Sequence, residues 1–192
     1  IEKGIHARLG ITGLHHLTYA YASCDPEKNR KIFYWLLSVF KYGSDVQKRY
    51  HDPHVMDFFD MTARVTLEIH RMHGLLRFAQ SEEGLYCAKF APDNNILPFL
   101  MPHFTQRLSD QPFLIYDCKR RLYGIYNGTE WKVISSEKEI QISFSQPEIL
   151  FRSLWKEYYR SVSIASRENR RLQDAYLPRR YRVFLTEFRD SP

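Results

Sequence analysis

The first third of the chain carries apolar residues at helical spacing. After Asp52-Pro53, a pair typical of a helix start, apolar positions alternate between spacings of three and four. These positions are Val55, Phe58, Thr62, Val65, Ile69 and Met72. The pattern predicts a long helix with one buried face and one solvated face. The solvated face is expected to carry Asp57, Asp60, Arg64, Glu68 and Arg71.

A shorter helix is expected before this one. Asp25-Pro26 precedes a run with apolar residues at helical spacing, and Gly43 follows that run. Proline in the first turn and glycine just past the end is the usual asymmetry of a helix. Residues 1 to about 72 are therefore expected to be helical.

Short runs rich in β-branched and aromatic residues follow. They predict strands at residues 75–79, 85–90, 113–117, 122–126 and 131–134. Asn127-Gly128, between the last two runs, is a strong hairpin signal. Residues 94–108 predict a helix that Asp93 or Asn94 caps and that its two prolines shorten or kink.

The last region is helical again, after a polar stretch at residues 135–145. Ser145 and Glu148 have the spacing of a capping box, with Pro147 in the first turn. An apolar stripe follows at Leu150, Phe151, Leu154, Trp155 and Tyr158. We expect Trp155 and Tyr158 to be buried, because aromatic residues on the apolar stripe of a helix usually pack on a core.

Together these elements predict an α+β protein. Amino-terminal helices and a long helix would pack on a mainly antiparallel sheet of about five strands. A helical carboxy-terminal lobe would follow. We expect residues 1–144 to form the first domain and residues 145–192 the basic lobe packed on it.

Positive charge is concentrated in that last lobe. Residues 151–192 hold ten Lys and Arg against five Asp and Glu, a local balance of +5 in a chain of net charge +6. Such a segment suits an anionic partner, and nucleic acid is the first candidate, because guanidinium groups bind phosphates through paired hydrogen bonds. The residues expected to bind phosphate are Arg152, Lys156, Arg160, Arg167, Arg170, Arg171, Arg179 and Arg180, with Lys119, Arg120 and Arg121 as an extension. The alternatives are that these cations are merely solvated, or that Arg167 and Asn169 are buried structural partners.

A second candidate site involves residues near the end of the long helix. Arg71, His73, Arg77 and Arg107 could form an anion pocket, or could instead form structural ion pairs. His70 and His73 have the spacing of two metal ligands, but no third ligand follows and His-Glu-x-x-His is absent. His51 and His54 repeat the spacing without more support. We therefore expect no metal site.

Composition excludes several classes of protein. No run of apolar residues approaches the roughly 18 that a membrane span needs, so we expect no membrane partner. Cys24, Cys87 and Cys118 are odd in number and widely spaced, which argues against a disulfide framework and favours the cytoplasm. No phosphate-binding glycine loop occurs, so we expect no cofactor. The carboxylates Asp93 and Asp117 are better explained as a helix cap and a turn residue than as catalytic groups.

Several short motifs resemble those of a bacterial family linked to DNA metabolism and DNA repair. They are Leu154-Trp155-Lys156-x-Tyr158-Tyr159, Arg167-x-Asn169-x-x-Leu172-Gln173, Pro178-Arg179-Arg180-Tyr181, His70-Arg71-Met72-His73-Gly74, Arg77-Phe78, Pro92-Asp93, Pro102-His103-Phe104 and Arg107. The resemblance runs from about Asp25 to Phe188. The carboxy-terminal half of that family is a domain of unknown function. Its members have a further segment before the point that matches Ile1, so we expect this chain to be a piece of a longer protein.

The resemblance also implies a biological setting. Members of the family neighbour a radical-SAM protein assigned to DNA modification or repair, and some are fused to a domain similar to uracil-DNA glycosylases. This setting suggests a DNA-binding component that works with a radical-SAM partner. The alternatives are an interaction module that binds this partner without DNA, and an enzyme that acts on damaged DNA, similar to a glycosylase or a nuclease. The resemblance brings no catalytic residues, so the sequence leaves open whether the protein is an enzyme.

Overall fold

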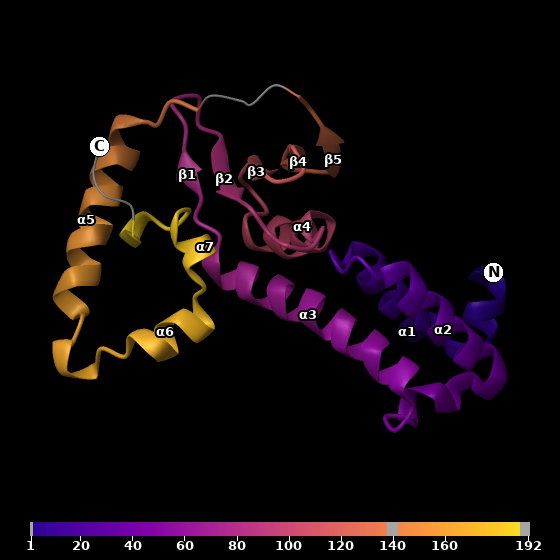
Figure 1. Cartoon of the computed structure of the whole chain (residues 1–192). Coiled ribbons are helices and arrows are strands. Elements are labelled where there is room, and N and C mark those ends of the chain that lie inside the picture. Colours follow the sequence, from indigo (N-terminus) through magenta and orange to yellow (C-terminus); the bar gives the residue numbers. More distant parts are fainter. Residues whose placement is uncertain (1, 138–141, 189–192) are drawn as a thin grey trace. The chain divides into compact units, whose positions relative to one another are not determined.

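The computed structural model describes residues 2–137 and 142–188, which form two compact units (Figure 1). The first unit contains residues 1–71 and 93–96, and the second contains residues 72–92 and 97–192. The sequence predicted a different division, into residues 1–144 and 145–192, and the separation of that last lobe stays a prediction. Residues 138–141 of the expected polar stretch lie outside the described residues.

The first unit is helical, as the apolar spacing predicts. It contains α1 (Glu2–Ala22), α2 (Lys28–Tyr42), the 3₁₀ helix η1 (Gly43–Lys48) and most of α3 (Pro53–Leu75). The Trp35 ring of α2 stacks on the Phe58 ring of α3 with their centroids 4.1 Å apart, at the centre of the core. Gly43 ends α2 with a φ of +59°, a conformation that favours glycine.

The apolar face of α3 is buried as predicted. All six of its expected core positions have exposed fractions below 10%. The prediction for Glu68 was wrong, because this side chain is only 5% exposed. Its carboxylate accepts hydrogen bonds from the backbone N–H of Asp93 and of Asn94, at 2.7 and 2.8 Å. Helical periodicity could not reveal this, because the partner segment returns to α3 from later in the chain.

Asn94 also departs from its expected role. Its side-chain amide donates to Glu68 at 2.7 Å, and its side-chain oxygen accepts from the backbone N–H of Cys24 at 2.9 Å. The side chain therefore joins α3 to the end of α1 and does not cap the helix that follows. Burial of a fully hydrogen-bonded carboxylate and amide ties residues 93–96 into the first unit.

The second unit contains a five-stranded mixed sheet. Its strands are β1 (Ala79–Gln80), β2 (Tyr86–Phe90), β3 (Phe113–Asp117), β4 (Leu122–Tyr126) and β5 (Trp131–Ser135), in that spatial order. Only β2 and β3 are parallel, so the predicted α+β fold with a mainly antiparallel sheet is confirmed. The last four strands lie where the sequence predicts them. The first does not, because α3 continues through Leu75 and leaves only a two-residue strand.

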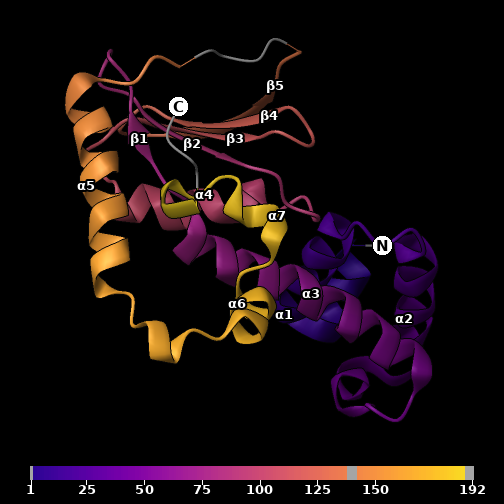
Figure 2. The ribbon, with the colours of Figure 1, turned by 60° about the vertical axis from the view of Figure 1, so that its left-hand side comes forward.

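The parallel pair requires a crossover connection, and α4 (Leu97–Arg107) provides it. This helix lies against one face of the sheet (Figure 2). The hairpin at Asn127-Gly128 is also confirmed. The Asn127 side-chain oxygen accepts from the backbone N–H of Thr129 and Glu130, and Gly128 has a φ of +99°. Both features are typical of a tight turn.

The contact between α4 and β4 leaves no room at Gly124. A Cβ at this position would overlap the Sδ atom of Met101 and lie 3.0 Å from Leu97 Cδ1. We expect Gly124→Ala to lower the free energy of unfolding by about 1 to 3 kcal/mol, because overpacking a dense core forces side chains out of their rotamers. Urea denaturation measures the change. Gly74→Ala is the control, because a Cβ at Gly74 meets no atom within 4 Å. Equal stability of both variants and the wild type would contradict the close packing at Gly124.

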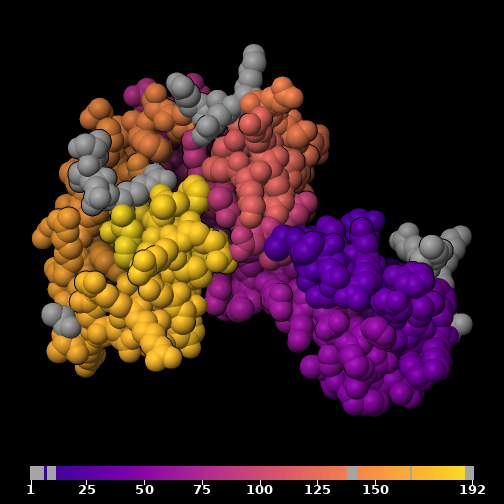
Figure 3. Space-filling view, in the orientation of Figure 1, coloured from indigo at the N-terminus to yellow at the C-terminus, as the bar shows by residue number. Residues whose placement is uncertain are grey.

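The chain ends in a series of helices. They are α5 (Gln146–Val162), η2 (Ala165–Arg167), α6 (Arg170–Tyr176), α7 (Arg179–Arg182) and η3 (Thr186–Phe188). The path leads out along α5 and returns through α6 and α7, so that η3 contacts α5 (Figures 1 and 2). In Figure 3 the atoms of α5 (orange) and of the returning segment (yellow) lie side by side. Tyr181 and Leu185 anchor the return, because both are buried.

Of the two hydrogen bonds of a capping box, only one forms at the start of α5. The Ser145 hydroxyl accepts from the backbone N–H of Glu148 at 3.3 Å, as predicted. The Glu148 carboxylate does not reach back to Ser145 and instead accepts from the backbone N–H of Gln80 at 3.2 Å. The backbone N–H of Ser145 donates to the Gln80 carbonyl. The first turn of α5 is therefore attached to β1.

The apolar stripe of α5 is exposed, which corrects the expectation for its aromatic residues. Phe151 is 66% exposed, Trp155 41% and Tyr158 56%. The helical pattern correctly identified the apolar face, but it carried no information on whether another element covers that face. Among the helices that the structure describes, none combines the length and hydropathy that crossing a bilayer requires.

Candidate anion pocket and nucleic-acid interface

A pocket of about 590 Å³ lies in the second unit. The last turns of α3 and α4, the approach to β1, one face of α5 and Thr186 of η3 form its wall. Three residues of the predicted anion pocket line it: His73, Arg77 and Arg107. Arg152, from the predicted nucleic-acid set, joins them. Arg71, the fourth predicted member, belongs to the first unit.

Glu187 holds Arg77 in place. The Arg77 guanidinium donates to the Glu187 carboxylate at 2.9 Å and to the Gly74 carbonyl at 2.9 Å. The second oxygen of Glu187 accepts from the Trp155 indole N–H at 3.1 Å. Burial by itself raises the pKa of Glu187, but the hydrogen bonds from Arg77 and Trp155 outweigh it, so that the pKa lies below its ordinary value. Glu187 is therefore an anion that fixes one cation and one aromatic ring of the pocket.

Arg152 and Arg107 have different surroundings. Arg152 lies over the Phe144 ring at 4.3 Å and has its Nε 3.5 Å from the Glu148 carboxylate. Arg107, in the last turn of α4, is exposed and has no carboxylate within 4 Å among the residues that the structure describes. Three arginines and Glu148 line the pocket, and Glu187 binds Arg77, so these five residues have a formal excess of one positive charge.

The rest of the pocket wall is aromatic. Phe78, Phe104, Phe151 and Trp155 line it. The His73 ring stacks on His103 with centroids 4.0 Å apart and meets Phe104 edge to face. Sequence reasoning missed Glu148, Glu187 and these rings as parts of one site. Phe78, Phe104 and Trp155 each had a local signal, since each belongs to a motif of the resemblance, but nothing in those motifs indicated that the rings share one site.

The cations of the carboxy-terminal segment are mostly exposed beside acidic neighbours. Arg160 lies 4.0 Å from Glu157, Arg170 3.0 Å from Glu168, and Arg179 3.5 Å from Asp174. These ion pairs are open to solvent and so are worth little, and phosphate can replace the carboxylate. Lys156 is half-buried, and Arg180 donates to the Tyr181 hydroxyl at 3.0 Å.

Among the arginines expected to bind phosphate, Arg167 and Arg171 have the fewest interactions within the protein. Both are exposed, and within the described ranges neither has a carboxylate within 4 Å. Asn169, between them, is exposed and caps α6 by accepting from the backbone N–H of Leu172 at 3.0 Å. The alternative in which Arg167 and Asn169 are buried structural partners is therefore wrong.

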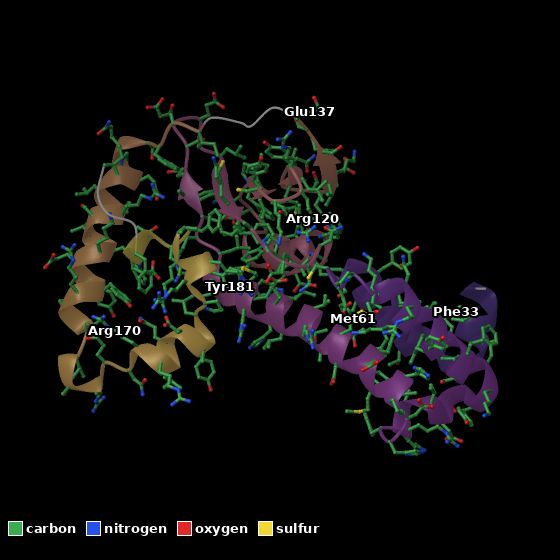
Figure 4. The ribbon with its side chains drawn as sticks, viewed as in Figure 1. Phe33, Met61, Arg120, Glu137, Arg170 and Tyr181 are labelled. Atoms are coloured by element: carbon green, nitrogen blue, oxygen red, sulfur yellow. The ribbon has the colours of Figure 1, made fainter. Side chains whose placement is uncertain are left out.

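The basic turn at residues 119–121 belongs to a different part of the unit. Arg120 lies at the sheet, whereas Arg170 lies on the carboxy-terminal segment (Figure 4). The Arg120 guanidinium donates to Asp117 at 3.1 Å and to the Pro92 carbonyl at 3.2 Å, and Asp117 is fully buried. Arg120 thus has a structural role, and Asp117 ends β3 as the turn residue that the sequence predicts. Lys119 and Arg121 are exposed.

The other candidate chemistries were metal binding and cysteine reactivity. Within residues 2–137 and 142–188, no group of three or more His, Cys, Asp and Glu side chains is arranged to hold a metal ion. Cys24, Cys87 and Cys118 are free thiols. Burial raises the pKa of the Cys87 thiol to about 11, so that it stays protonated and behaves as a small core residue.

The fold and the pocket define an α+β protein with a basic, aromatic-lined pocket beside an exposed basic segment. Residues 26–187 match a domain of unknown function, DUF4130, and the chain belongs to this family. The match covers nearly the same residues as the resemblance seen in the sequence. No curated protein and no solved structure matched the chain.

Proposed function

We propose that this protein is a DNA-binding component of a DNA repair or modification system and works with a radical-SAM partner. The observation that carries the proposal is the exposure of aromatic rings beside arginines on the carboxy-terminal segment. The nature of the system and of the partner follows from the motif resemblance. A cytoplasmic location is part of the proposal and agrees with the three free cysteines.

Exposed aromatic residues and arginines together favour single-stranded nucleic acid. Unpaired bases stack on aromatic rings with little dependence on sequence, while cations bind the phosphates. Trp155 and Tyr158 lie on α5 with their ring centroids 5.7 Å apart, and Arg152, three residues before Trp155, lines the same pocket as Trp155. A folded protein usually covers such rings, so their exposure supports a binding role.

A salt titration tests this function. Fluorescence anisotropy with labelled single-stranded and double-stranded DNA should show binding that weakens steeply as salt rises, because each bound phosphate releases counterions. We expect the variant Arg167→Gln/Arg171→Gln to bind several-fold more weakly and to lower the salt slope by about 1 to 2.

The control removes equal charge elsewhere. Lys48 and Lys132 are exposed and lie outside the carboxy-terminal segment, so Lys48→Gln/Lys132→Gln should keep wild-type binding. Negligible binding of the wild type at low salt, or equal losses in both double variants, would reject the proposal.

A second candidate is an interaction module that binds the partner protein without DNA. The exposed apolar residues Leu150, Phe151 and Leu154 of α5 favour it, because a contiguous apolar stripe suits a protein surface. Co-purification that survives nuclease treatment and is lost in Leu150→Ser/Leu154→Ser, with no DNA affinity in the isolated chain, would support this candidate over DNA binding.

A further inference from the structure

We infer that the pocket between α3, α4 and α5 binds one nucleotide, with its base against the aromatic wall and its phosphate at Arg107 and Arg152. The inference rests on the proposed DNA-binding function and deepens it, because the nucleotide would be the end of a bound strand or a base turned out of it. A free nucleotide presents the same chemistry. The pocket volume of about 590 Å³ lies within the range of roughly 300 to 1,000 Å³ that holds small ligands.

The pocket contains buried guanidinium donors. The Nε atom of Arg77 is buried and has no hydrogen-bond partner among the described residues, and the Nε atom of Arg152 is buried with only the Glu148 carboxylate near it, at 3.5 Å. Arg107 adds an exposed guanidinium without a carboxylate neighbour. A phosphate group offers several acceptor oxygens and a negative charge, and so fits this side of the pocket.

The aromatic rings of the pocket favour a different kind of ligand group, a flat ring that can stack. Phe151 and Trp155 are both exposed and both line the pocket. The Glu187 carboxylate holds the Trp155 indole N–H, so that the ring has a fixed position before any ligand binds. A ring that is already positioned and solvated gains from stacking at little cost in entropy. Glu187 is thus a positioning residue for this site.

Neither the guanidinium groups nor the aromatic rings alone indicate which ligand fits the whole pocket. An inorganic anion would leave the aromatic wall in water, and an apolar ligand would leave the Arg107 guanidinium without an anionic partner. A nucleotide combines a flat aromatic ring with a phosphate and satisfies both. Glu148 is engaged with the Gln80 backbone N–H and with Arg152, and Glu187 is engaged with Arg77, so Arg107 is the arginine of the wall without a carboxylate neighbour among the described residues.

Tryptophan fluorescence can measure this binding. Trp131 is replaced by Phe, which leaves Trp155 in the pocket and Trp35 buried in the first unit. Titration of this protein with thymidine 5′-monophosphate should quench Trp155 to saturation, whereas thymidine or inorganic phosphate alone should give far weaker binding. Arg107→Gln should raise the Kd for the monophosphate about tenfold, because a charge-assisted contact to phosphate is lost. Lys132→Gln, at an exposed cation outside the pocket and outside the carboxy-terminal segment, should leave the Kd unchanged.

The same variants in the DNA assay separate this inference from the proposed function. Salt-dependent DNA binding without saturable monophosphate binding, and with Arg107→Gln equal to wild type in both assays, would overturn the inference and leave the function standing. Monophosphate binding that depends on Arg107, without DNA binding, would support a site for free nucleotides and reject the DNA function. Equal quenching by phosphate and by the monophosphate would overturn the role of the aromatic wall. Because Arg107 is exposed, its substitution should leave the fold intact, which circular dichroism checks.

Discussion

Replacement of Glu68 by Ala should lower the free energy of unfolding by about 3 to 5 kcal/mol. The Glu68 carboxylate is the acceptor for two backbone N–H groups and one side-chain amide from residues 93 and 94. All of these donors lie within the first unit, and the Glu68 and Asn94 side chains are each only 5% exposed. Ala leaves the donors without partners, and each buried donor without an acceptor costs about 1 to 3 kcal/mol.

Urea denaturation followed by Trp35 fluorescence is the suitable measurement. Trp35 is buried in the first unit, and replacement of Trp131 and Trp155 by Phe removes the signal of the second unit. Glu68→Gln should lower the free energy of unfolding by less than Glu68→Ala does, because the Gln side chain keeps one acceptor oxygen. Asp60→Ala, at an exposed position of the same helix, is the control and should change little. If Glu68→Ala were as stable as Asp60→Ala, the hydrogen-bonded cluster would have no energetic role.

Removal of the Glu187 carboxylate should have the second largest effect. Glu187→Ala is expected to lower the free energy of unfolding of the second unit by about 2 to 3 kcal/mol, because it leaves the Arg77 charge without its partner and the Trp155 N–H without an acceptor. The Arg77 side chain is 30% exposed, so water compensates part of the loss, which places this effect below that of Glu68→Ala.

The effect of Glu187 should depend on pH. The pKa of Glu187 in the folded protein is lower than in the unfolded chain, so the folded state binds the proton less readily. The stability that this difference contributes is fully present above the ordinary Glu pKa of about 4.3 and is lost as the pH falls through the lower folded value. The difference in stability between wild type and Glu187→Gln should therefore shrink below about pH 4.3.

Denaturation curves at several pH values measure this difference. Glu157→Gln is a matched control, because Glu157 is 75% exposed and lies on α5. Its stability relative to wild type should change little over the same pH range. A difference between wild type and Glu187→Gln that stayed constant down to pH 3 would show that Glu187 does not titrate with folding.

Local patterns in the sequence were enough for most of the elements. The six apolar positions of α3 recur at helical spacing, and all of them are buried. Asn127-Gly128 encodes its own turn, because the Asn side chain and the Gly backbone satisfy the geometry without help from the rest of the chain. Each of these features depends on residues that are close in sequence, so single-sequence reasoning could predict it.

The candidate site was predicted only in part. Three of the four residues expected in an anion pocket do line one pocket, although the sequence predicted a strand at residues 75–79, where α3 in fact continues through Leu75. Glu187 follows Arg77 by more than a hundred positions, and nothing near either residue indicates the pairing. The aromatic wall was also missed, because its rings come from three separate elements.

The sequence by itself determined most of the helices and strands, the apolar face of the long helix and of α5, and where the positive charge lies. These properties follow from neighbours in the chain and from composition. Only the tertiary structure decided that Glu68 is buried, that the apolar stripe of α5 is exposed, and that Arg77, Arg107 and Arg152 line one pocket. Burial and pairing depend on which distant segments meet, and helical or strand periodicity carries no information on that.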